Sequence, residues 1–475
     1  MPQTVYIGQS YELMGNKVAA IKKKIMKKKI AFISEHASPL ATLGSVDSGG
    51  QNVYVAELPK QLVKFGYNID IYTRKESESV DEVINWLPGI RVIHIKAGPE
   101  KVVPKEELLP LMPQFSKNMI SFIEREQIYY ELIHANFFMS ALVASDVKNE
   151  LNIPFVVTFH ALGLVRKLHQ KEMDKFPPER INIERKIVKV ADHIIAECPQ
   201  DKEDLIHHYH ANPNKIKIVP CGFSAAEFFP IDKSYARNFL NLPQDENILL
   251  QLGRMVPRKG VDNVIRAVGE IKKKNRSLRL VVVGGEHEDP DPALCPELAR
   301  LQKLAVENGV ASSVIFTGRK QRDVLKYYYA AADVFITTPW YEPFGITPLE
   351  AMACGTAVIG SNVGGIKYTV EDGKTGFLVP PHDPAALAEK IEALIADEKL
   401  LKRMHANALK RVKTYFTWRG VAASCHSLYQ KIIATQEKEY RHESILNLDK
   451  FKITNPSFLL NDSFYLNNKV PAINE

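Results

Sequence analysis

Cysteine is scarce in this chain and is not clustered. The 475 residues include five cysteines, spread from Cys198 to Cys425, with none close enough to another to form a metal-binding pair. This spacing excludes a zinc cage and a disulfide framework. It fits a reducing compartment, so we expect a cytoplasmic protein.

Long apolar runs are also absent. No stretch reaches the ~18 residues needed to span a bilayer. The basic N-terminal segment leads straight into the strand-like run Ile30–Ile33, which does not resemble a signal peptide. The lysine cluster between Lys22 and Lys29 leaves two interpretations open. It is a solvated chain end, or it makes a weak peripheral contact with an anionic membrane, at about 1 kcal/mol per lysine.

The charge balance does not favour a nucleic-acid partner. The formal net charge of +7 is modest for 475 residues, and no RNA- or DNA-binding motif accompanies it. Hydrophobic residues make up 45% of the chain and charged residues 25%, which is typical of globular proteins. The length favours two domains, and no repeat of solenoid length is visible.

Short apolar runs alternate with amphipathic stretches along both halves of the chain. This pattern predicts an α/β protein with two doubly wound, Rossmann-like domains. Continuous apolar runs such as Leu280–Val283 imply strands buried on both faces. Because ligands bind outside the carboxyl ends of such strands, we expect the functional site in a cleft between the two sheets.

The expected domain boundaries follow changes in composition. The predicted helices include Gly50–Phe65 and Glu106–Glu126. We predict a basic extension (residues 1–27), an N-terminal domain (28–222), a polar linker (223–244), a C-terminal domain (245–415), a helix expected to cross back to the first domain (416–437) and a polar tail (438–475).

Two loops that follow predicted strands are suited to binding a phosphate group. Gly49 and Gly50 open the first helix, where backbone N–H groups can approach an anion and the helix N-terminus favours it. The segment is neither a dinucleotide fingerprint nor a P-loop, so a tight turn is the alternative. Arg254 and Lys259 lie on a second loop, punctuated by Pro257 and Gly260. Fixed cations there would stabilise a departing nucleoside diphosphate, unless they belong to a solvated basic loop.

A segment with two carboxylates spans a predicted strand-to-helix turn. Glu342 and Glu350 flank Gly345, where backbone N–H groups can face a ligand, and Pro348, which suits a first helical turn. Carboxylates accept hydrogen bonds from sugar and ribose hydroxyls. Glu350 alone is also explained as an acid that the helix dipole favours.

Three further features have more than one interpretation. His160 ends a buried strand and is either structural or functional. Asp289 and Asp291 have the Asp-x-Asp form of a manganese site, but no supporting ligand pattern accompanies them, so we expect no metal. The pair Gly364-Gly365 either lies near the diphosphate or forms an ordinary loop.

Together these motifs resemble glycosyltransferase family 4, whose members have the GT-B fold. Gly-Gly-Gln-Asn, the Gly-Arg…Lys-Gly loop and the Glu-x7-Glu segment occur in the family's order, and the likeness covers roughly residues 28–436. The N-terminal motifs are most similar to sucrose-phosphate synthases and to the inositol-phosphate glycosyltransferases of mycothiol synthesis. The resemblance implies a retaining hexosyltransferase with a UDP- or GDP-linked sugar as donor and no cofactor.

The resemblance also implies a role for each motif residue. His160, Arg254, Lys259 and Glu342 would be the catalytic residues, with the two cations on the diphosphate and His160 at the transferred sugar. The remaining donor-binding positions would be Gly49 and Gly50 at the diphosphate, Arg319 near the base, Phe344, Gly345 and Ile346 at the sugar, and Glu350 at the ribose.

The acceptor site departs from the pattern of the inositol-phosphate enzymes, which hold the acceptor phosphate with a Lys, a Tyr, a Thr and an Arg. Lys105 and Arg180 match the two cations, but Phe137 and Ala161 stand where the hydroxyls would be. We therefore expect an acceptor other than inositol phosphate, either a small molecule such as a sugar or polyol phosphate, or a glycan. Alternatively, Arg180 pairs with Glu184, four residues later on a helix.

Two other functions remain open. A nucleotide-sugar 2-epimerase of the GT-B fold would share the nucleotide site and would change the nucleotide sugar without an acceptor. A non-catalytic nucleotide-sugar-binding protein would be expected to have damaged motifs, yet Arg254, Lys259, Glu342 and Glu350 are all present.

Overall fold

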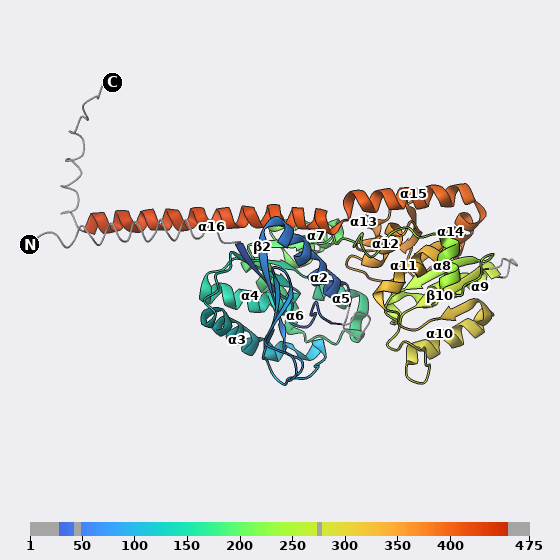
Figure 1. The fold of residues 1–475 in the computed structure, drawn as a ribbon, viewed down its shortest axis with the longest axis horizontal. Coiled ribbons are helices and arrows are strands. Elements are labelled where there is room, and N and C mark those ends of the chain that lie inside the picture. Colours follow the sequence, from blue (N-terminus) through green and yellow to red (C-terminus); the bar gives the residue numbers. More distant parts are fainter. Residues whose placement is uncertain (1–27, 42–48, 273–277, 455–475) are drawn as a thin grey trace, which may run out of the picture. The chain divides into compact units, whose positions relative to one another are not determined.

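The computed structural model describes residues 28–41, 49–272 and 278–454. They contain two mainly parallel β-sheets with helices packed against them, one sheet in each half of the chain (Figure 1). The expected basic extension, residues 1–27, lies outside the described residues, as does the end of the expected tail.

The first sheet has eight strands in the order β3-β4-β2-β1-β5-β6-β7-β8. All pairs are parallel except β3 with β4, where β3 forms an antiparallel edge. In the central strand β1, Ile33 pairs with Tyr72 on one side and Ala135 on the other. The strands are β1 Lys28–Ile33, β2 Tyr67–Arg74, β3 Val83–Leu87, β4 Ile90–Ile95, β5 Leu132–Asn136, β6 Phe155–Thr158, β7 His193–Ala196 and β8 Ile216–Ile218.

Helices connect these strands and bury apolar stripes against the sheet. In α3, Phe115, Met119 and Phe122 recur every three or four positions and are buried, which is the helical period. This helix begins later than expected because Pro110 lies in a 3₁₀ turn that precedes it. The helices are α2 Gly50–Leu62, α3 Met112–Arg125, α4 Phe138–Leu151, α5 Gly163–Gln170, α6 Glu179–Val190 and α7 Pro199–Tyr209.

The second sheet is parallel throughout, in the order β11-β10-β9-β12-β13-β14. The run Leu280–Val283 in β10 is at most 2% exposed, as expected for a strand covered on both faces. The strands are β9 Asn247–Leu252, β10 Leu278–Val283, β11 Val314–Phe316, β12 Val334–Thr337, β13 Ala357–Ser361 and β14 Gly376–Val379.

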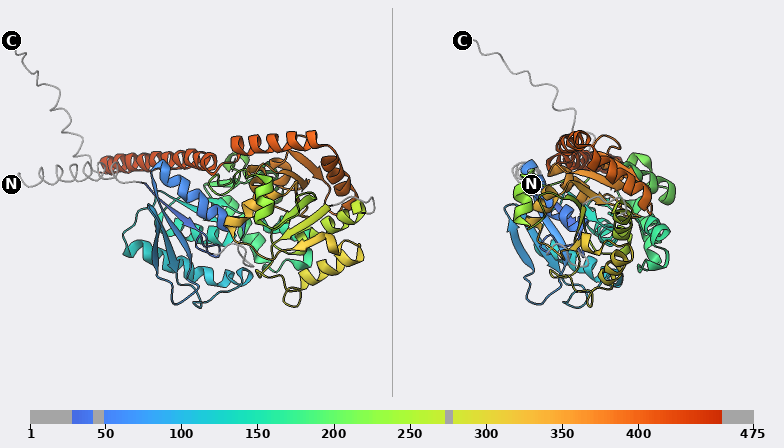
Figure 2. Two further views of the ribbon diagram at one scale, coloured as in Figure 1. Left: turned by 45° about the vertical axis from the view of Figure 1, so that its right-hand side comes forward. Right: turned by 90° about the vertical axis from the view of Figure 1, so that its right-hand side faces the viewer.

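Helices also lie beside the second sheet, as Figure 2 shows from two sides. They are α8 Lys233–Phe239, α9 Val261–Lys272, α10 Pro296–Glu307, α11 Arg322–Ala331, α12 Ile346–Ala353, α13 Ile366–Thr369, α14 Pro384–Ala396 and α15 Glu398–Tyr415. The long helix α16, Trp418–Thr454, follows them in the chain and does not belong to this group (Figure 1). Within the described residues, none of the helices combines the length and the apolar character needed to cross a membrane.

The segment expected as a linker, residues 223–244, contains helix α8. The Arg237 guanidinium donates to Asp333 Oδ2 at 2.8 Å, and Lys233 Nζ lies 2.7 Å from Asp333 Oδ1. Because Asp333 precedes β12, this part of the segment is attached to the second sheet.

The chain passes between the two sheets a second time at residues 416–418. Phe223 N donates to Phe416 O at 2.9 Å, so the outgoing and returning segments lie side by side. Helix α16 starts there and continues to Thr454, past the end expected at residue 437. The described residues from Ser427 onward form a unit separate from the rest of the chain.

Candidate active site

A cleft lies where loops after the strands of both sheets meet. Its cavity is about 330 Å³ in volume. Phe137 and His160 follow β5 and β6 in the first sheet, and Arg254 follows β9 in the second. Of the predicted site residues, only Arg180 is outside the cleft lining, which includes Gly49, Gly50, Lys105, Phe137, His160, Arg254, Lys259, Arg319, Glu342, Phe344, Gly345, Ile346 and Glu350.

Helix α2 begins at the edge of this cleft. Asn52 Oδ1 accepts a hydrogen bond from Gly49 N at 2.9 Å, which caps the first turn. Among the residues that the structure describes, a Cβ atom at Gly49 would meet nothing within 4 Å, and one at Gly50 would lie 3.5 Å from Ile346 Cδ1. The helix N-terminus therefore lies against the second domain at Ile346, and no other described residue crowds Gly49.

A cationic turn, residues 254–259, forms the opposite wall. Lys259 Nζ forms an ion pair with Glu342 Oε2, and Arg258 Nη1 lies 3.6 Å from the same oxygen. Burial alone would favour neutral Glu342, but the charges of Lys259 and Arg258 outweigh it and lower its pKa to about 2. Burial lowers the pKa of the Lys259 ammonium, while the Glu342 carboxylate acts in the opposite direction.

The loop that carries Glu342 is packed tightly against a glycine pair. Gly364 has φ +45°, and a Cβ atom there would lie only 1.9 Å from Glu342 O. Gly365 N donates to Pro343 O at 3.0 Å. The glycines are thus needed for the close approach of two backbones. This contact gives Gly364-Gly365 a structural role in positioning the Glu342 loop.

Glu350 is buried, at 3% exposure, and both of its carboxylate oxygens have partners. Arg322 Nη1 donates to one oxygen and the Tyr329 hydroxyl to the other, each at 2.9 Å. Burial raises the pKa of Glu350, against the opposing effect of Arg322. No sequence motif pointed to Arg322, although its side chain also lines the cleft.

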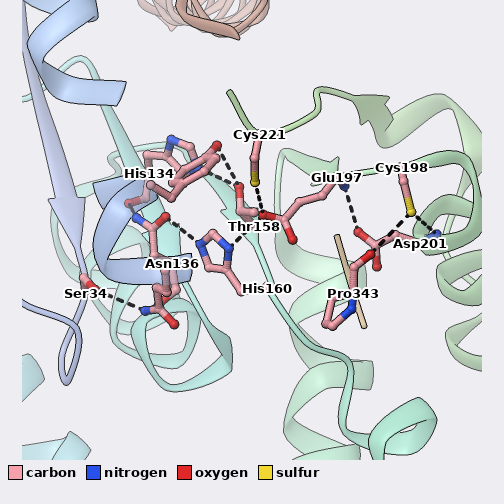
Figure 3. A network of polar contacts seen from close by, with 12 residues as sticks. Ser34, His134, Asn136, Thr158, His160, Glu197, Cys198, Asp201, Cys221 and Pro343 are labelled. Atoms are coloured by element: carbon pink, nitrogen blue, oxygen red, sulfur yellow. Dashed lines mark hydrogen bonds and ion pairs between the residues drawn. The ribbon is translucent and has the colours of Figure 1, made fainter. Parts of the chain in front are cut away.

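His160 lies in a network of polar contacts at the carboxyl ends of the first sheet (Figure 3). Its Nδ1 is 3.0 Å from Glu197 Oε1, and its Nε2 is 3.1 Å from Asn136 Oδ1. The amide nitrogen of Asn136 donates to the carbonyls of Ile33 and His134, which leaves its oxygen facing His160. Both ring nitrogens of His160 are therefore within hydrogen-bonding distance of a side-chain oxygen atom.

Glu197 and Asn136 are site residues that sequence reasoning did not identify. Each is a single polar residue at or just after the end of an apolar strand, which is a weak signal without the neighbouring strands. Glu197 is 3% exposed and also accepts a hydrogen bond from Cys221 Sγ at 3.1 Å. His160 itself has φ +57°, a conformation that is uncommon for residues other than glycine.

Arg180 is 2% exposed and lies behind the cleft wall. Its Nε donates to Glu184 Oε1 at 2.8 Å, which is the pairing left open as an alternative. Its guanidinium carbon is 4.5–4.8 Å from the ring centres of Phe137, Phe138 and Phe176. Direct contact between Arg180 and an acceptor therefore remains a prediction without support from its position.

The Asp-x-Asp loop lies between β10 and α10, and both aspartates are exposed. Asp291 Oδ1 accepts a hydrogen bond from Ala293 N at 2.8 Å, as in an ordinary turn. Among the residues that the structure describes, no group of three or more His, Cys, Asp or Glu side chains could hold a metal ion.

Comparisons with known proteins show which family this chain belongs to. Residues 48–227 match the family model described as Glycosyltransferase Family 4, and residues 232–411 match Glycosyl transferases group 1. The D-inositol 3-phosphate glycosyltransferase of Corynebacterium glutamicum (strain R) is 34% identical over 414 residues, 86% of this chain and 98% of the relative. The chain belongs to glycosyltransferase family 4. The family and the enzyme class predicted from the motifs are thereby confirmed.

Solved structures confirm the predicted GT-B fold of this family 4 glycosyltransferase. Sucrose-phosphate synthase from Thermosynechococcus elongatus superposes with a TM-score of 0.78 at 34% identity, covering 86% of this chain and 100% of that one. Anabaena Alr3699/HepE, solved in complex with UDP and glucose, has a TM-score of 0.66 at 20% identity, covering 85% of this chain and 99% of that one. The second likeness concerns the fold alone.

Proposed function

We propose that this enzyme transfers a hexosyl group from a UDP- or GDP-linked sugar to a hydroxyl of a phosphorylated sugar or polyol, with retention of anomeric configuration. The observation that carries the proposal is the cationic turn with Arg254 and Lys259 in the same cleft as the N-terminus of α2. A relative named as an inositol-phosphate glycosyltransferase and a neighbour named as a sucrose-phosphate synthase support the acceptor class.

The donor diphosphate would lie between Gly49-Gly50 and the cations Arg254 and Lys259. Glu342 holds Lys259 in place before the donor arrives, and its low pKa keeps that partner ionised. An incoming diphosphate then provides Lys259 with a second anionic partner. Glu350 at the ribose and Arg319 near the base complete the proposed donor site.

The transfer would proceed as a same-face displacement. The bond from the anomeric carbon to the diphosphate oxygen breaks while the acceptor oxygen attacks from the same side, and the departing phosphate accepts the acceptor proton. Arg254 and Lys259 stabilise the charge on that leaving group. Glu342 is paired with Lys259 and Glu350 with Arg322, so neither is placed as a glycosidase-type nucleophile. The backbone carbonyl of His160 would face the oxocarbenium-like sugar.

A mass-spectrometric screen tests the proposal. The enzyme is mixed with UDP- and GDP-hexoses and with phosphorylated and unphosphorylated sugars and polyols, with and without EDTA. We expect a glycosylated phosphate ester with retained configuration, formed equally well in EDTA. Conversion of the donor without an acceptor would indicate an epimerase, and donor binding without turnover would indicate a binding protein. Loss of activity in EDTA that manganese restores would assign a metal-binding role to Asp289 and Asp291.

A further inference from the structure

Two arginines in the cleft lining, Arg166 and Arg322, belong to none of the motifs, and Arg322 is already paired with Glu350. Arg166 lies on α5 and lines the same cavity as Lys105 and Phe137. Its Nε donates to Asp174 Oδ1 at 2.7 Å, and its guanidinium carbon lies 5.1 Å from the centre of the Phe176 ring. These two contacts orient the guanidinium. Among the residues that the structure describes, its two Nη atoms have no hydrogen-bond partner, so they remain available to a ligand.

Arg180, by contrast, is fixed in a structural cluster. Besides its bond to Glu184, its Nη2 donates to the backbone carbonyl of Ala161. Glu184 also accepts hydrogen bonds from Gly163 N, at 2.9 Å, and from the Tyr209 hydroxyl. The pair thereby joins the start of α5 to α6 and α7. Moving Arg180 toward an acceptor would leave a buried carboxylate without its cation, which is strongly unfavourable.

Aromatic rings separate the two arginines. The Phe137 and Phe176 rings lie 5.7 Å apart, and Phe137 also contacts the ring of His36 at 5.0 Å. Arg180 packs against both phenylalanines and is outside the cavity lining, whereas Arg166 packs on Phe176 and is inside it. The arginine that reaches the cavity beside Phe137 is therefore on α5, whereas Arg180 is on α6.

We propose that Arg166, with Lys105, binds the acidic group of the acceptor, and that Arg180 is a structural residue. This inference rests on the proposed function and names the residue that binds the negatively charged group of the acceptor. A guanidinium offers a planar fork of donors that matches two phosphate oxygens. With Nε held by Asp174, the two Nη atoms supply that recognition, and Lys105 adds a second positive charge.

The test compares matched acceptors in Arg166→Ala, Arg166→Lys and the wild type. The acceptors are hexose 6-phosphates with the free hexoses, and D-inositol 3-phosphate with free inositol. Arg185→Ala is the control, because Arg185 is exposed on α6. We expect Arg166→Ala to raise KM for the phosphorylated acceptor by about ten- to a hundredfold, the effect of losing hydrogen bonds to a charged group. KM for the donor and for neutral acceptors should stay unchanged, and Arg166→Lys should be intermediate.

The outcomes separate this inference from the proposed function. If the wild type prefers phosphorylated acceptors and both Arg166 variants keep that preference, the assignment of Arg166 is wrong while the proposed function stands. If the wild type prefers neutral acceptors, both the acceptor class and the inference are wrong. Thermal melting of each variant shows whether the fold is intact, and Arg166→Lys provides the decisive comparison if Arg166→Ala does not fold.

Discussion

Lys259 is a partly buried cation with a carboxylate partner, Glu342, in a cleft that would hold a diphosphate. Replacing it with alanine should lower kcat by about a hundred- to a thousandfold, because a positioned donor to a developing anion has an effect of about 3 kcal/mol. Measurements of kcat and of melting temperature in Lys259→Ala test this expectation. Lys303→Ala is the control, since its side chain is 80% exposed on α10. A folded Lys259→Ala enzyme with wild-type kcat would remove Lys259 from the catalytic machinery.

Glu197 lines the cleft and contacts His160, and we expect it to act by positioning that histidine. It holds Nδ1 of a histidine whose backbone has φ +57°, so it helps to fix where the His160 carbonyl points. Small misplacements of a catalytic group can cost up to ~100-fold in rate. We expect Glu197→Gln to reduce kcat about tenfold or more, with donor KM changed far less.

The matched control for Glu197 is Glu203→Gln, which changes an exposed residue on α7 in the same way. A fall in donor affinity equal to the fall in kcat would show that Glu197 acts on binding and does not position His160.

At the scale of single elements, the N-terminus of α2 offers a direct test of the donor site. A Cβ atom at Gly49 would contact none of the residues that the structure describes, and Gly49 has extended backbone at φ −168°. Gly49→Ala should therefore fold as the wild type does. If the donor diphosphate approaches this backbone, as proposed, the added methyl group would meet the ligand and raise donor KM. Isothermal titration calorimetry with UDP and GDP measures how much the methyl group weakens binding of the diphosphate. An affinity equal to that of the wild type would place the diphosphate elsewhere.

Strands with continuous apolar runs were predictable from the sequence, because a strand that is buried on both faces needs apolar residues at every position. The loops after those strands were also identified, since glycine, proline and charge are unusual there. The edge strand β3 was not expected: its burial pattern is mixed, and Trp86 and Leu87 alternate between partly buried and exposed positions. Its pairing with β4 is a tertiary contact that leaves no periodic pattern in so short a segment.

The acceptor side shows what a local pattern cannot predict. Arg180 matches a family position, yet whether it faces the cleft or Glu184 depends on the rings of Phe137, Phe138 and Phe176 around it. Glu197 and Asn136 meet His160 only because β5, β6 and β7 are neighbours in the sheet. Such contacts follow from topology and packing.

At the scale of the whole molecule, the crossing of the two connecting segments lies next to the site. The Trp418 ring packs edge-on against Tyr54 at 5.7 Å, and Tyr54 packs against His160 at 4.9 Å. The outgoing segment approaches closely at Gly222, where a Cβ atom would lie 2.6 Å from Trp418 N and 2.9 Å from the carbonyl carbon of Thr417. Both atoms belong to the backbone, so only a shift of the crossing itself can make room.

Gly222→Ala should therefore destabilise the fold and disturb the site together. Overpacking of this kind costs about 1–3 kcal/mol, which corresponds to a fall of a few degrees in melting temperature. The displaced segment carries Trp418, which packs on Tyr54, and Tyr54 in turn packs on His160. We therefore also expect kcat to fall, because moving Trp418 would shift His160. Gly420→Ala is the control: it adds the same methyl group two residues past Trp418, at an exposed position where the nearest atom is the Thr417 side-chain oxygen at 3.3 Å. If Gly222→Ala melts and turns over like Gly420→Ala, the crossing is free to move and does not position His160.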